Sequence, residues 1–401
     1  MLSNISEIYN LYVKVCHDMD NYLGKGNLID SYFGKDSYKI TANMTHWELQ
    51  EQLKELKNKV NLYIDDSFPL YKKTFLIKHI DALLMQLGIK HTKVDFNEAI
   101  NTLYDICSGK PDIDKIQSIH GQIDELLKQE GYILGSLKQR VLKWKEINQI
   151  TTNDFLKEIY KNINDYSQLT YNFINQYIML KNNPVELNDN LELKIVETDE
   201  GWAAYNNYLK NYKGVIEFNK EAKFSKYSIR TFLSHEAYPG HHTSSLIKEC
   251  LYSNNELESY ATMNLLKTPT SLIEEGIGDC AYQIINKFPV SENDKIEQLL
   301  DDLSAEVDYL ATYEYYKNQT AKEKIFKLLI DYKFMRGEKD AYRSFNFIKN
   351  WGMYIPTYKY GRQYISDFLK NYPKKYWYIL YYPCCISTLD RWKQDVKFCK
   401  G

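Results

Sequence analysis

The spacing of hydrophobic residues predicts a chain built mainly from amphipathic helices. Apolar residues recur three or four positions apart, as at Leu49, Leu53 and Leu56. This period places them on one face of an α-helix and leaves the other face to water. A second run of the same kind comprises Leu76, Ile80, Leu83, Leu84 and Leu87. We therefore expect residues 1–183 to form an N-terminal helical region.

Two short stretches in the middle of the chain depart from the helical period. Apolar and polar residues alternate along residues 191–198, which is typical of a half-buried strand. Residues 213–219 predict a second short strand, and residues 202–210 between them are compatible with a helix. The two strands predict a small β-hairpin or short sheet within an otherwise helical chain.

The helical pattern returns in the C-terminal half and continues to its end. Helices are predicted over residues 228–248, 252–265 and 268–287, with later turns at Gly352, Pro356, Pro373 and Pro383. The break Asn182-Asn183-Pro184 is the one plausible boundary, between residues 1–183 and 184–401. We expect both regions to form one mainly α body around a cleft.

Composition and charge argue against several classes of protein. Among 401 residues, 51 Lys and Arg stand against 53 Asp and Glu, a net charge of −2. This balance predicts neither a nucleic-acid nor an anionic-membrane partner. No stretch reaches the ~18 apolar residues of a membrane helix, and no signal peptide is visible. Seven cysteines without a short repeated spacing indicate free thiols, so a cytoplasmic protein is expected.

The densest group of chemically active side chains lies in residues 234–242, which read S-H-E-A-Y-P-G-H-H. Three of the eight histidines fall here, and an acidic residue directly follows the first. Imidazole is the commonest ligand for transition metals, and a neighbouring carboxylate can accept a proton from water. A lone histidine is usually a core or surface residue, but this cluster predicts a metal site.

The spacing of these histidines requires a break in the helix. His235 and His241 lie six residues apart, roughly 240° around an unbroken helix, and could not share an ion there. His235 and His242 share a face but would lie about 10 Å apart, too far for two bonds of ~2 Å. Pro239 and Gly240 are residues that bulge or break a helix. We therefore expect His235 and His241 to be ligands, with His242 adjacent.

A third ligand is expected from residues 273–282. Glu275 and Asp279 lie four apart on a predicted helix and face the same way. Glu275 can complete the site, and Asp279 can hold a ligand histidine through its other ring nitrogen. Gly276 and Gly278 would allow the backbone to approach a metal or substrate closely. Alone, the segment is typical of an acidic helix start; beside the histidines, the ligand interpretation is favoured.

Residues 235–242 resemble, in full, the H-E-x-x-P-G-H-H pattern of the DUF885 family of zinc-dependent hydrolases, which are similar in plan to helical metallopeptidases. Residues 275–280 are similar to the family's E-G-W-A-x-Y segment only at Glu275 and Gly276. Residues 357–361 resemble its later S-Y-x-x-G segment. The family's late histidine has no counterpart, since no histidine follows His242. The resemblance covers roughly residues 190–370.

The resemblance implies a zinc-dependent hydrolase, most specifically a metallopeptidase. Zn²⁺ would be held by His235, His241 and Glu275, with one position left for water. Glu236 would accept the proton of the attacking water and pass it to the leaving amine. Asp279 would orient a ligand histidine.

The resemblance also suggests how a substrate is held. Tyr358 is the family-matched candidate for stabilising the oxyanion, with Tyr360 and His242 as alternatives. In related metallopeptidases an exposed strand beside the metal helix pairs with extended substrate. Residues 213–219, ending at Asn219, are the candidates for that edge here, and an ordinary hairpin is the alternative.

The expected substrate is a peptide or a small amide, and other classes of function stay open. One is a metal-dependent hydrolase of a non-peptide amide or ester. Another is an inert helical binding protein with a relic metal site, although a relic would have no need of Glu236. A structural zinc is disfavoured because such sites usually close with four protein ligands, commonly cysteines.

Overall fold

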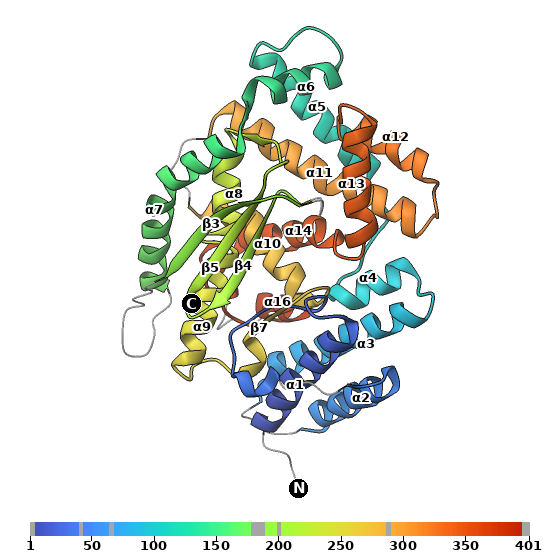
Figure 1. Cartoon of the computed structure of the whole chain (residues 1–401), viewed down its shortest axis with the longest axis vertical. Helices are drawn as coiled ribbons and strands as arrows, with labels where there is room; N and C mark the ends of the chain where they lie inside the picture. Colours follow the sequence, from blue (N-terminus) through green and yellow to red (C-terminus); the bar gives the residue numbers. More distant parts are fainter. Residues whose placement is uncertain are drawn as a thin grey trace.

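The structure is a computed structural model that describes residues 5–39, 43–63, 68–177, 189–198, 202–285 and 290–394. Helices make up most of these residues and the sheets are small, which confirms a mainly α fold (Figure 1). The expected break at Asn182-Asn183-Pro184 lies outside the described residues. No helix in the described ranges is both long enough and apolar enough to span a bilayer.

The first helices gather at one end of the molecule, shown in blue in Figure 1. They are α1 (Ile5–Leu23), α2 (His46–Leu62), α3 (Leu70–His91) and α4 (Phe96–Tyr104). A capping box starts α2, since Thr45 and Glu48 each accept a hydrogen bond from the other's backbone N–H. The buried positions of α2 include those predicted from the helical period, namely Leu49, Leu53 and Leu56.

The next three helices are α5 (Ile113–Gln129), α6 (Leu137–Asn148) and α7 (Thr152–Tyr177). The Asp112 side chain caps α5 by accepting a hydrogen bond of 2.9 Å from the Lys115 backbone N–H. In Figure 1, α5 and α6 lie at the opposite end from α1. The long helix α7 runs beside the main sheet in the same view.

The main sheet has the order β3 (Asn190–Val196), β5 (Lys213–Asn219) and β4 (Ala204–Lys210). β3 runs parallel and β4 antiparallel to β5. The strands predicted within 191–198 and 213–219 are confirmed, but residues 202–210, which are compatible with a helix in sequence, contain the strand β4 instead. Asn211 and Tyr212 have φ values of 56° and 57°, which makes the tight connection of a two-residue hairpin.

The position of β5 also changes which strand is an edge. Residues 213–219 form the central strand, so the expectation that they offer an exposed edge is wrong. β3 and β4 are the two outer strands, and β4 pairs only with β5 among the strands that the structure describes. The register pairs Ala204 with Phe218 and Asn206 with Ile216.

Two smaller sheets join distant parts of the chain. β1 (Ile29–Tyr32) pairs with β7 (Met263–Leu265), and β2 (Gln149–Ile150) pairs with β6 (Phe224–Ser225). The helix predicted over 252–265 is therefore wrong. Its last residues pair with β1, more than 200 residues away, and a 3-10 turn at Ser259–Ala261 precedes them.

The C-terminal half is helical, as expected. Its helices are α8 (Ser228–Glu236), α9 (His241–Ser253), α10 (Pro269–Ile284), α11 (Glu292–Tyr316), α12 (Lys322–Tyr332), α13 (Glu338–Trp351), α14 (Pro356–Asn371), α15 (Tyr376–Ile379) and α16 (Ile386–Gln394). Short 3-10 helices occur at Asp36–Lys39 and Pro373–Lys375.

Two glycines allow the backbones of α10 and α14 to come into direct contact where the two helices cross. A Cβ at Gly361 would lie 2.5 Å from the Leu272 carbonyl oxygen, and one at Gly276 would collide with the Gly361 carbonyl. Side chains of α14 can therefore reach the same space as those of α10. This crossing lies at the centre of the molecule in Figure 1.

The largest hydrophobic cluster contains side chains from both halves of the sequence. Leu76 and Leu83 of α3 belong to it together with Ile277 of α10 and Phe368 of α14. Burial of such side chains contributes roughly 1.5–3 kcal/mol each. The cysteines within the described ranges are free thiols, and four of them are buried: Cys16, Cys280, Cys384 and Cys385.

Candidate metal centre

The helix predicted over 228–248 is broken between α8 and α9, at the expected proline and glycine. α8 ends at Glu236 and α9 begins at His241. A Cβ at Gly240 would collide with the carbonyl oxygen of His235, so only glycine fits this fold-back of the chain. The break brings the Nε2 atoms of His235 and His241 to 3.0 Å from each other.

Glu275 of α10 joins the two histidines. Its Oε2 lies 3.5 Å from His235 Nε2, and possible ligand atoms of His235, His241 and Glu275 all lie within 4.8 Å of one another. Two ligands of a tetrahedral zinc ion, each ~2 Å from it, lie about 3.3 Å apart. The measured spacings therefore suit three ligands of one ion.

The surroundings of Glu275 fit a bound cation. The residue is 7% exposed, and its Oε1 accepts a hydrogen bond of 2.7 Å from the Tyr354 hydroxyl. Its Oε2 is buried and accepts no hydrogen bond from any described residue. A buried carboxylate oxygen without a partner is costly, and a cation beside it would remove that cost. Tyr354 was not predicted, although it lies four residues before Tyr358.

Asp279 lies where the sequence placed it, behind His235. Its Oδ1 is 3.2 Å from His235 Nδ1, and its Oδ2 accepts a hydrogen bond of 3.1 Å from Arg362 Nε. Burial would raise the pKa of Asp279, but Arg362 and His235 outweigh burial and lower the pKa to about 2. An anionic Asp279 favours a proton on Nδ1 and leaves the Nε2 lone pair for a metal.

Arg362 was not predicted from the sequence. It lies one turn after Tyr358 on α14, so the two side chains share a helix face. Its guanidinium also pairs with Asp302 of α11, which holds it in place. The helical spacing from Tyr358 was the signal that could have found it.

Glu274 supports the second histidine. One of its oxygens lies 4.0 Å from His241 Nδ1, and its carboxylate is paired with Lys248. Burial would raise the pKa of Glu274, but Lys248 and His241 outweigh burial and lower the pKa to about 2. Glu274 and Glu275 are both buried, so this segment is not a solvated acidic helix start.

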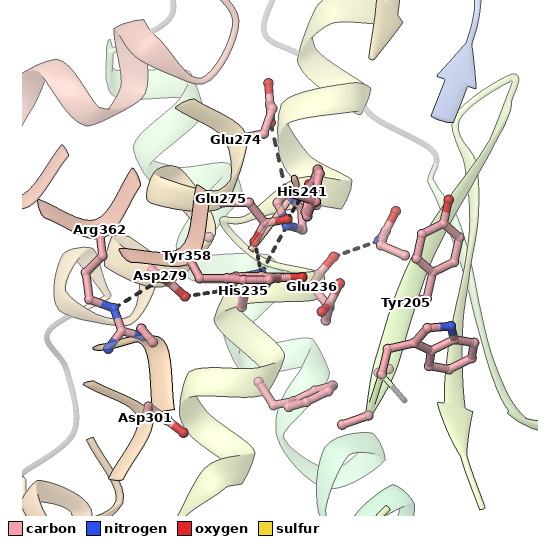
Figure 2. Close-up of a pocket in the computed structure, with 18 of the residues that line it drawn as sticks. Tyr205, His235, Glu236, His241, Glu274, Glu275, Asp279, Asp301, Tyr358 and Arg362 are labelled. Carbon is pink, nitrogen blue, oxygen red and sulfur yellow. Dashed lines mark hydrogen bonds and ion pairs between the residues drawn. The ribbon is translucent and has the colours of Figure 1, made fainter. Parts of the chain in front are cut away.

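Glu236 ends α8 with its carboxylate in the pocket (Figure 2). The residue is 9% exposed, and no described residue forms a hydrogen bond or ion pair with its carboxylate. Burial raises the pKa of Glu236, and His235 and His241 oppose that rise. Its backbone carbonyl accepts a hydrogen bond of 2.7 Å from Asn206 Nδ2, which ties the outer strand β4 to the end of α8.

Tyr358 lines the same pocket, and in Figure 2 its side chain reaches across His235 toward Glu236. Burial, together with Glu275 and Glu236, raises the pKa of Tyr358, so the hydroxyl keeps its proton. This hydroxyl makes no hydrogen bond to another residue of the described part. It is therefore available to donate to a bound molecule.

The two alternatives to Tyr358 lie elsewhere. His242 is fully buried away from the described pocket walls, with Nε2 3.2 Å from Asp189 Oδ2. One residue further along a helix turns the side chain by ~100°, which carries His242 to the sheet side, against Gly214. Tyr360 also lies outside the pocket lining, with its hydroxyl 3.2 Å from that of Tyr309. As oxyanion donors, both are wrong.

The pocket itself is large, with a volume of about 1120 Å³. β4 and Trp202 form one wall, and α10, α11 and α14 contribute to the other. Gly278 also lines the pocket, and a Cβ there would lie 2.8 Å from the His235 ring. Gly278 thus admits a ligand side chain and Gly276 a neighbouring helix, and close approach of this backbone to a metal or substrate stays a prediction.

Comparison with known proteins finds solved structures with a similar fold. No family model and no curated protein matches the chain. A crystal structure from Colwellia psychrerythraea has a TM-score of 0.58 at 16% identity, over 86% of this chain and 69% of that one. A structure from Shewanella oneidensis has a TM-score of 0.50 at 14% identity, over 87% and 73%. Both are provisionally described as lipoproteins, the second of unknown function. At this identity the likeness concerns the fold alone.

Proposed function

We propose that the chain is a zinc-dependent hydrolase of amide bonds, most specifically a metallopeptidase. The observation that carries the proposal is the convergence of His235, His241 and Glu275 beside the unpaired carboxylate of Glu236. The resemblance of residues 235–242 to the DUF885 pattern supports the same reading.

The donor set suits a catalytic zinc ion better than a structural one. Two imidazoles and one carboxylate leave a fourth position open, whereas structural sites usually close with four protein ligands. When bound, zinc would polarise the scissile carbonyl and make water a stronger acid. Asp279 and Glu274 hold the two histidines from behind, and Tyr354 holds Glu275.

Glu236 is the proposed proton acceptor. Its carboxylate faces the pocket and has no competing partner among the described residues. It would take a proton from the attacking water and deliver it to the leaving amine, so that the amine departs neutral. Tyr358 would donate its hydroxyl hydrogen bond to the oxygen that becomes negative during the attack.

The outer strand β4 offers a way to hold an extended substrate. It lines the pocket through residues 204–206, and Asn206 links it to Glu236. The backbone of an extended peptide could pair with this edge without requiring particular side chains. The sequence suggests residues 213–219 for this role, and we assign it to residues 204–210 instead.

The test is the variant Glu236→Gln, which keeps the shape of the side chain and removes its proton acceptor. The purified variant should bind zinc as the wild type does, by elemental analysis, and should lose hydrolysis in a peptide-library digest followed by mass spectrometry. Glu125→Gln, at an exposed position of α5, is the matched control. Loss of zinc, or unchanged turnover, in Glu236→Gln would contradict the proposal. A panel of small amides and esters separates a peptidase from a hydrolase of non-peptide substrates.

A further inference from the structure

The pocket carries far more negative charge than a metal site requires. Its lining contains three Lys and Arg residues and ten Asp and Glu residues, namely Asp30, Glu217, Glu236, Glu274, Glu275, Asp279, Asp301, Asp302, Asp308 and Asp340. The formal charge of the lining is therefore −7 with neutral histidines, whereas the whole chain carries −2. A divalent ion would leave an excess of about five negative charges in the pocket.

Some of these carboxylates are neutralised within the protein. Arg362 pairs with both Asp279 and Asp302, and Lys333 Nζ lies 2.6 Å from Asp308 Oδ2. Glu274 is paired with Lys248. Arg362 carries one charge for two carboxylates, so most of the excess charge, but not all of it, belongs to carboxylates that lack such partners.

Asp301 is the unpaired carboxylate of most interest. It lies on α11, and Figure 2 places it on the Arg362 side of the centre, away from Tyr205 of β4. No hydrogen bond or ion pair joins its carboxylate to another residue in the described ranges, whereas Arg362 pairs directly with the neighbouring Asp302 and with Asp279. Burial raises the pKa of Asp301 to about 6, with Arg362 opposing and Asp279 reinforcing the rise.

The same pocket shows independently that it is built to receive positive charge. Glu236 and Glu275 both line the pocket and are 9% and 7% exposed. The carboxylate of Glu236 and the Oε2 atom of Glu275 accept no hydrogen bond from a described residue. Carboxylates buried to this degree are rarely left unpaired unless a ligand supplies the partner. One cation at the metal centre accounts for these two, but not for Asp301.

We propose that the hydrolase takes substrates that carry an amine or a basic side chain close to the scissile bond, and that Asp301 receives this positive charge. The inference rests on the proposed function and names its substrate class. A cleft lined by one sign of charge focuses its field and concentrates ligands of the opposite sign. A charge pair in a partly buried site is also stronger than one on the open surface. An anionic substrate would be repelled by the same groups.

The test uses three series of hydroxamates on the zinc-loaded full-length protein. The hydroxamate group binds the metal, and a tail of two to six methylenes ends in an ammonium, a methyl or a carboxylate group. At the best tail length, the ammonium compound should bind about tenfold more tightly than the methyl compound, and the carboxylate compound most weakly. In Asp301→Asn, the ratio of the ammonium and methyl affinities should fall severalfold, to the smaller preference that the other carboxylates of the pocket support. Glu125→Gln removes the same charge from an exposed position and should keep the wild-type ratio.

The outcomes separate this inference from the proposed function. Equal affinity for all three tails in the wild type would overturn charge selection and leave the zinc hydrolase standing. An undiminished preference for ammonium in Asp301→Asn would overturn the role of Asp301. If the wild type takes up no zinc and binds no hydroxamate, the proposed function fails and this inference fails with it. The wild-type comparison requires no variant, so poor folding of Asp301→Asn cannot obscure it.

Discussion

Gly278 provides the sharpest test of the geometry of the metal centre. It lies in α10 with its Cα facing the ring of His235, three residues after the expected ligand Glu275. The variant Gly278→Ala adds one methyl group at this contact. We expect the variant to fold and to bind zinc about 10–100-fold more weakly than the wild type, the loss typical when the support of a metal ligand is disturbed.

The magnitude follows from the distances around the ring. A Cβ at position 278 would lie 2.8 Å from two ring atoms of His235, whereas ordinary contacts begin at 3.4 Å. The ring must therefore withdraw by roughly 0.6 Å, more than the ~0.5 Å that a preorganised site tolerates. It cannot move freely, because Asp279 holds its Nδ1 at 3.2 Å and Arg362 holds Asp279.

The stability of the metal-free fold is a separate quantity, which the added methyl group changes in two opposing ways. Alanine gains about 0.5–1 kcal/mol over glycine inside a helix, while overpacking costs about 1–3 kcal/mol. The net change in unfolding free energy is therefore a loss of at most about 2.5 kcal/mol. This partial cancellation makes zinc affinity the discriminating measurement.

The assay is a zinc titration against a competing chromophoric chelator, with the melting temperature of the metal-free protein measured alongside. Gly121→Ala in α5 is the matched control, since a Cβ there would meet nothing within 4 Å. It should leave zinc affinity unchanged. Wild-type affinity in Gly278→Ala would refute the reasoning that His235 is a ligand held against this glycine.

Three further predictions test other parts of the structure. Tyr358→Phe should lower kcat roughly 10²–10³-fold with zinc affinity intact, as expected for loss of an oxyanion donor; unchanged kcat in steady-state assays would assign that role elsewhere. Gly361→Ala should lower the unfolding free energy in denaturant titrations by about 1–3 kcal/mol, because its Cβ would lie 2.5 Å from the Leu272 carbonyl oxygen. Gly88→Ala, with open space around it, should show no such loss, and equal stability of the two variants would contradict the close crossing of α10 and α14. Burial lowers the pKa of His79 to about 3, so the native state stays unprotonated where the unfolded chain binds a proton. The resulting stability is present above about pH 6.5 and is lost as the pH falls toward 3, by about 2 kcal/mol between pH 7 and pH 5. His79→Gln should lack this component of the pH dependence, and identical pH profiles for the two proteins would contradict it.

Much of the candidate centre could be predicted because the relevant signals are local. The interval between His235 and His241 is incompatible with a straight helix, and a proline and a glycine within it supply the break. The spacing of Glu275 and Asp279 by four residues places them on one helix face. Neither inference needs knowledge of another part of the chain.

The contacts of the supporting residues could not be predicted in the same way. Glu274 and Arg362 act on His241 and on Asp279 through contacts between different helices. Asp301 approaches from α11, next to the Asp302 that pairs with Arg362 of α14. Such relations exist only once the helices are packed.

The amino-acid sequence by itself determined the helical periods, the broken helix and the shared helix face of Glu275 and Asp279, because these depend on residues within one or two helical turns. Only the tertiary structure decided that 204–210 is an outer strand, that 263–265 pairs with β1, and that His242 faces the sheet. Strand pairing and burial depend on partners that lie far away in the sequence, so local preference cannot choose among them.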